Sequence, residues 1–229
     1  MATRQRVTID KRDLRRYLKE NFLPRLGSEW QQSRDDMLTR RNGLIVQGVY
    51  FDRSSYGKRF VPNFFVQVLA IPVDHFTMQL GSRLRDKRGA ELWLDWPSED
   101  DVLANSIFEA YRKQANPPFD QSLTLEAAIH YIETVHRKSD HFHDRWSLGI
   151  LYGFQGNLKD AYKQFDLAKR DLQKRASGWQ SKGKVPPEWM ESNVAEISEF
   201  MSKLETVDVF RTYCEEQAAR TAAALKLSL

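Results

Sequence analysis

Three of the five histidines lie in one short stretch, residues 136–144, with the sequence HRKSDHFHD. The side chains there that could bind a metal ion are His136, His141 and His143, with Asp140 or Asp144 as a further ligand. Imidazole and carboxylate groups hold zinc only when several converge on one point. Basic side chains crowd this stretch, and no HExxH pattern completes a ligand set. We therefore expect no metal site, and a metal-dependent hydrolase is the weaker alternative.

Basic side chains near the N-terminus suggest a second chemistry, the neutralisation of nucleic-acid phosphates. Residues 1–60 hold 14 Lys or Arg against 7 Asp or Glu, although the whole chain carries only +4. The candidate contacts are Arg40, Arg41, Arg53, Lys58 and Arg59. Aromatic residues lie among them and could stack on unpaired bases. A nucleic-acid-binding accessory protein is therefore an alternative function. A second basic run occupies residues 169–184.

Nucleophilic and nucleotide-dependent chemistry has little support. The chain contains no GxSxG, GxxxxGK[ST] or GxGxxG sequence. Its single cysteine, Cys214, excludes an internal disulfide and fits a reducing cytoplasm. We expect Cys214 to be a packing residue, because it lies in a helical pattern without a nearby histidine. No cofactor, secretory signal or membrane span is expected, and the protein is predicted to be non-enzymatic.

The N-terminal half has the pattern of an α+β domain with four to five antiparallel strands. Apolar spacing predicts a helix over residues 10–26. Strand-like periods follow at residues 37–41, 44–52, 60–71, 76–80 and 92–96. Asn42-Gly43 predicts a tight hairpin between the first two, since both residues tolerate positive φ. A capping pattern at residues 98–101 begins a further helix.

This order of a helix followed by a meander is centred on RNGLIVQGVYFDRSSYGKRFVPNFFVQV. It is similar to an uncharacterised bacterial family called domain of unknown function 4304, over about residues 10–115. The resemblance implies a bacterial α+β domain and carries no activity with it. Pro117-Pro118 predicts a boundary between a sheet domain, residues 1–116, and a helical domain, residues 117–229.

The helical half contains one stretch with a recognisable spacing, WSLGILYGFQGNLKDAYKQFDLA from Trp146. The residues that carry the spacing are Leu148, Gly149, Tyr152, Gly156, Ala161, Phe165 and Ala168. They resemble the signature of a tetratricopeptide repeat, a pair of antiparallel helices, here over residues 142–172. The resemblance implies that Gly149 and Ala161 let the helices approach and that the protein is an interaction scaffold.

Further helical periods flank this hairpin. One covers residues 125–135, and another runs from residue 188 to residue 226 as either one bent helix or two. Residues 176–187, ASGWQSKGKVPP, read as a basic loop. We therefore expect a non-enzymatic bacterial cytoplasmic protein that binds another protein through its helical half. An immunity or defence-system component would fit this description.

Overall fold

The computed structural model describes residues 8–78, 80–96, 100–114, 121–136 and 141–227. The chain divides into two compact units. Met1–Gln67 and Phe76–Thr124 form the sheet unit, whereas Val68–His75 and Leu125–Leu229 form the helical unit. The double proline at which the sequence predicts a domain boundary lies outside the described residues. The fold class is α+β, as the sequence predicts.

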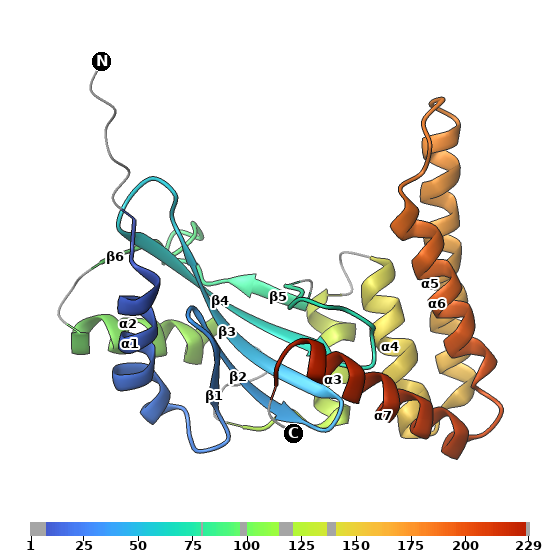
Figure 1. The fold of residues 1–229 in the computed structure, drawn as a ribbon, viewed down its shortest axis with the longest axis horizontal. Helices are drawn as coiled ribbons and strands as arrows, with labels where there is room; N and C mark the ends of the chain where they lie inside the picture. Colours follow the sequence, from blue (N-terminus) through green and yellow to red (C-terminus); the bar gives the residue numbers. More distant parts are fainter. Residues whose placement is uncertain (1–7, 79, 97–99, 115–120, 137–140, 228–229) are drawn as a thin grey trace. The chain divides into compact units, whose positions relative to one another are not determined.

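The sheet unit is built on an antiparallel sheet (Figure 1). Its strands are β1 (Gln31–Arg34), β2 (Met37–Asn42), β3 (Ile45–Arg53), β4 (Arg59–Val68), β5 (Leu80–Arg83) and β6 (Leu94–Asp95). The order is β1-β2-β3-β4-β5, and β6 pairs with β4. Asn42 pairs with Ile45 at the β2–β3 turn, where Gly43 has a φ of 57°. The predicted Asn-Gly hairpin is confirmed.

The strand predicted at residues 76–80 is wrong in position, because β5 comprises Leu80–Arg83. Phe76 lies before it, buried with its ring 5.8 Å from that of Phe65. The alternation of the sequence there reflects this burial rather than ladder pairing. β4 ends at Val68 rather than residue 71. The polar strand β1 was not expected, since it lacks an apolar period.

The helices of the sheet unit pack against the sheet through aromatic side chains. The first is α1 (Lys11–Tyr17), continued by a π turn, η1 (Leu18–Phe22), and a 3₁₀ turn, η2 (Leu23–Arg25). Asp10 caps it, because its carboxylate accepts a hydrogen bond from the N–H of Arg12 at 2.7 Å. The ring of Phe22 lies 5.3 Å from that of Phe51 in β3 and 4.4 Å from that of Phe108 in α2 (Asp100–Gln114).

The helical unit contains α3 (Leu125–Tyr131), its π continuation η3 (Ile132–His136), α4 (Phe142–Gln155), α5 (Leu158–Gln180), α6 (Glu188–Ser202) and α7 (Val207–Ala224). The sequence left open whether residues 188–226 form one bent helix or two. They form two, α6 and α7, since the chain leaves the helical conformation around residues 203–206. The segment Val68–His75 is tied to this unit by a hydrogen bond from Thr221 to the carbonyl of Ile71, 3.3 Å long. No described helix is long and apolar enough to cross a membrane.

The loop predicted at residues 176–187 is shorter than expected, because α5 continues through Gln180. Gly178 suggested a break, but the helix accommodates it on an open side, where an added Cβ would have no atom within 4 Å. The chain turns further on, where Gly183 adopts a φ of 67°. Positive φ is what glycine provides at such a turn.

Helices α4 and α5 form the predicted hairpin. Gly156 ends α4 with a φ of 106°, and Asn157 caps α5 through a hydrogen bond from the N–H of Asp160 at 3.3 Å. A Cβ at Gly149 would lie 2.6 Å from the ring of Phe165, so Phe165 is the residue that needs this glycine. The rings of Phe200 and Phe210 lie 5.8 Å and 6.2 Å from that of Phe165 and complete the core.

Candidate functional site

One of the histidines predicted as weak metal candidates, His141, caps helix α4. Nδ1 of His141 accepts a hydrogen bond from the N–H of His143 at 3.4 Å, and the two rings stack 5.2 Å apart. Burial, then the neighbouring His141 and Arg175, lowers the pKa of His143 to about 3. The side chain of His136 lies outside the described residues. Among the residues that the structure describes, no three His, Cys, Asp or Glu side chains are placed to hold a metal ion.

Arg40, predicted to contact nucleic acid, is only 1% exposed. Its guanidinium donates hydrogen bonds to Glu29 at 2.7 Å, to Gln47 at 2.9 Å and to the carbonyl of Gln121. The ring of Trp30 lies 5.0 Å from its guanidinium carbon. Arg40 therefore joins β2 to the segments that flank it, and no phosphate can reach it at the surface.

The other predicted nucleic-acid contacts do not gather at one end of the sheet, because Arg41 lies beside the β2–β3 turn, whereas Arg59, at the start of β4, lies beside the far end of β3. Arg41 pairs with Val46 near the turn, whereas Arg53 ends β3, which has nine residues. At about 3.3 Å per residue, these ends are more than 20 Å apart. Arg53 donates to the carbonyl of Ile9 at 3.0 Å, and Arg59 pairs with a carboxylate. Lys58 is exposed. The hairpin predicted from the sequence, with its turn at Asn42-Gly43 and a strand over residues 44–52, already implies this separation.

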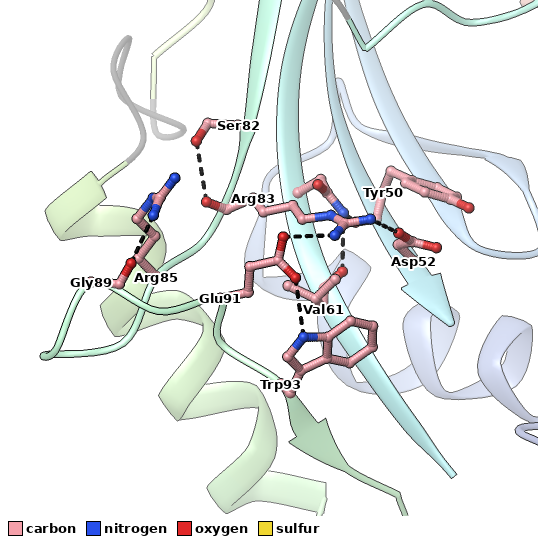
Figure 2. Close-up of polar contacts among 10 residues, drawn as sticks. Tyr50, Asp52, Val61, Ser82, Arg83, Arg85, Gly89, Glu91 and Trp93 are labelled. Carbon is pink, nitrogen blue, oxygen red and sulfur yellow. Dashed lines mark hydrogen bonds and ion pairs between the residues drawn. The ribbon is translucent and has the colours of Figure 1, made fainter. Parts of the chain in front are cut away.

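A polar network that the sequence did not reveal surrounds Arg83 of β5 (Figure 2). Its guanidinium binds Asp52 at 2.5 Å and Glu91 at 2.7 Å, and the indole N–H of Trp93 donates to Glu91 at 3.1 Å. The hydrogen bond from Arg83 lowers the pKa of Glu91, and burial followed by Asp52 raises the pKa of Tyr50. Because both carboxylates are held by Arg83, neither is free to act as a base. The network links strands and is not a catalytic pair.

A cavity of about 310 Å³ lies in the helical unit. It is lined by Ile132, Glu133, Asp144, Arg145, Leu148, Lys163, Gln164 and Leu167. The hydroxyl of Tyr152 donates to Glu133, and burial followed by this contact raises the pKa of Tyr152 to about 12. Asp144 and Arg145 also have polar partners. Glu133, Asp144 and Arg145 therefore already interact with other groups of the protein.

Helix α5 is longer than the helix against which it folds back. It has 23 residues and α4 has 14, and the two meet at the Gly156 turn. At 1.5 Å per residue, α5 extends about 13 Å beyond the start of α4. Leu172 is the last buried residue of α5. Beyond it α5 and α6 continue as a helical pair, with the connecting turn at its far end (Figure 1). We call residues 169–195 the α5–α6 tip.

The tip exposes apolar side chains and contains a groove. Trp179, Val185 and Trp189 are 40%, 87% and 45% exposed. Between the helices lies a groove of about 250 Å³, lined by Leu172, Gln173, Ala176, Met190, Glu191, Val194 and Ala195. The ring of Trp189 stacks at 5.9 Å on that of Phe142, which fixes its orientation. Exposed tryptophan side chains and a groove between helices are features of binding surfaces.

The tip is also basic on its α5 side. Residues 169–184 contain six Lys or Arg and one Asp. Arg175 pairs with Asp171 at 3.0 Å, and the ammonium of Lys184 lies 5.9 Å from the ring centre of Trp179. Lys174 and Lys182 are exposed and have no ion pair within the described ranges of the chain. The sequence showed the charge of this run, but its loop assignment hid the helical face.

Cys214 is not available as a nucleophile, because it is buried and burial raises the pKa of its thiol.

The structure defines an α+β sheet unit and a helical unit whose α5–α6 tip has an exposed apolar and basic surface. Comparison with protein-family models, with curated proteins and with solved structures gives no match for this chain. The functional assignment therefore rests on the chain's own residues.

Proposed function

We propose that this chain is a non-enzymatic protein that binds another protein through the α5–α6 tip. The observation that carries the proposal is the exposure of Trp179 and Trp189 on a helical pair that extends beyond α4, and of Val185 in the turn that connects the two helices. Tryptophan is enriched among the residues that dominate binding energy in protein interfaces. Trp179 and Trp189 lie on helices, which restricts these two side chains and lowers the entropy that is lost on binding a partner.

The two alternatives from the sequence have less support. Nucleic-acid binding by the sheet unit has less support because Arg40 is buried and because Arg41 lies at the opposite end of the β2–β3 hairpin from Arg53. A metal-dependent hydrolase has less support because Nδ1 of His141 already accepts a hydrogen bond that caps a helix. A bacterial cytoplasmic setting belongs to this proposal, supported by the family resemblance and by the single cysteine. We also propose a role in immunity or defence, which is one kind of protein binding that suits this description.

Site-specific photo-crosslinking in the source cells tests this proposal. A benzophenone side chain at position 185 should give one discrete crosslinked protein, because Val185 lies at the end of the tip. The matched control is Tyr162, which is 55% exposed on α5 but outside the tip. The crosslink at 185 should disappear in Trp179→Ser/Trp189→Ser and persist in Tyr162→Ser. Equal crosslinking from both positions, or a crosslink that survives the double substitution, would show that the tip is not the binding surface.

A further inference from the structure

We infer that the partner segment is an amphipathic helix that lays an apolar stripe into the α5–α6 groove and turns acidic residues toward α5. This inference rests on the proposed function and goes further, since it specifies the shape and the charge of the occupant. It follows from the form of the groove, from the charges along its two walls and from the helical nature of both walls.

The groove has the form that a third helix requires. On α5, Leu172 and Ala176 are four residues apart and line the groove on successive turns, and on α6 Met190 and Val194 do the same. Such i,i+4 rows form the ridges and grooves in which helices pack, with axes about 8–10 Å apart. Ala176 and Ala195 are small, so a backbone can approach closely. Both walls satisfy their backbone groups within their own helices, which leaves no edge for an extended strand.

The charges differ between the two walls. On the α5 wall, Lys169 lies one turn before Gln173 of the groove. Lys182 and Lys184 add positive charge in the connection that follows the end of α5. On the α6 wall, Glu191 lines the groove itself. A bound helix should therefore place Asp or Glu toward α5 and neutral or basic residues toward α6. Complementary charges of this kind fix orientation and raise association rates.

An anionic membrane is the other surface that tryptophan and lysine side chains could meet. The groove favours a protein helix instead, because a flat lipid surface cannot fill a concave space between two helices. Glu188 and Glu191 lie at the same end of α6 and would face the lipid headgroups. We therefore assign the groove to a helix of a partner protein.

Selection from a displayed library of random 16-residue peptides tests this inference with the full chain as bait. Enriched peptides should repeat apolar residues at i, i+3 or i+4, and i+7, with Asp or Glu beside them. In fluorescence anisotropy, Ala195→Trp, which fills the groove, and Lys169→Glu/Lys182→Glu should each raise the Kd of such a peptide by about tenfold or more. Lys174→Glu is the matched control, since Lys174 lies about 140° around the helix from Lys169. It should change Kd by less than about twofold.

Each result separates this inference from the proposed function. Enriched peptides that are neutral or basic, yet lose binding in Ala195→Trp, would overturn the acidic-helix inference and leave the tip as a protein-binding surface. If no groove-dependent peptides were enriched but the crosslink at position 185 were specific, the acidic-helix inference would again be overturned and the tip would remain a protein-binding surface. Peptides that bind equally to Ala195→Trp, with no specific crosslink, would overturn both. Cosedimentation with phosphatidylglycerol vesicles that is lost in Trp179→Ser/Trp189→Ser would assign the tip to a membrane.

Discussion

Two glycine-to-alanine substitutions in the helical unit should have opposite effects on stability. Gly149 lies inside α4, where an added Cβ would be 2.6 Å from two carbons of the Phe165 ring. Gly178 lies inside α5, where an added Cβ would have no atom within 4 Å. Both substitutions gain the same kind of helix propensity, about 0.5–1 kcal/mol. Only Gly149→Ala also meets a packed ring.

The magnitude follows from how firmly Phe165 is held. Its side chain is fully buried, and the rings of Phe200 and Phe210 lie 5.8 Å and 6.2 Å away, so it cannot move aside without disturbing them. Overpacking of this kind costs about 1–3 kcal/mol. Gly178→Ala should therefore stabilise by about 0.5–1 kcal/mol. Gly149→Ala should be less stable than Gly178→Ala by about 1–3 kcal/mol, because their shared propensity gain cancels.

Urea denaturation followed by circular dichroism measures this difference as a shift in midpoint at constant slope. Gly149→Ala combined with Phe165→Leu should recover part of the packing cost, because leucine vacates the space that the ring occupies. If Gly149→Ala stabilised the protein as much as Gly178→Ala, the close approach of α4 to Phe165 would be refuted. The helical hairpin would then need a different register.

Three further outcomes follow from buried polar groups. Arg40→Ala should destabilise the protein by about 3–5 kcal/mol, because it removes a buried partner of Glu29 and Gln47. Glu29→Gln should cost less, because the Glu29 carboxylate is half exposed. The urea midpoints of the two variants measure this difference. His143 has a pKa lowered to about 3 from 6.5, so the unfolded state binds more protons between these values. Stability should therefore fall as pH drops through that window, and the slope should lessen in His143→Gln. Cys214 is buried with a raised thiol pKa, so Ellman's reagent should label it only after denaturation; rapid labelling of the native protein would contradict its burial.

Local patterns in the sequence determined the elements whose ends depend on nearest neighbours. Asn42-Gly43 marked the β2–β3 turn, and Gly156-Asn157 marked the turn between α4 and α5, since positive φ and side-chain capping are properties of a few adjacent residues. Apolar spacing likewise placed Phe165 in a helical core. The same local logic failed at residues 176–180, because Gly178 can be carried within a helix when its surroundings are open.

The tertiary structure alone decided which of the candidate groups could act. Arg40 reads as a surface cation in the sequence, but in the structure it is enclosed by partners that include Glu29 and Gln121, which lie 11 and 81 residues away from it in the chain. Folding also brought Arg83 between the carboxylates of Asp52 and Glu91. The groove of the α5–α6 tip exists because α5 is longer than α4 and α6 packs along its outer turns. Burial and charge pairing at these sites depend on contacts between distant segments, and a one-dimensional pattern does not contain them.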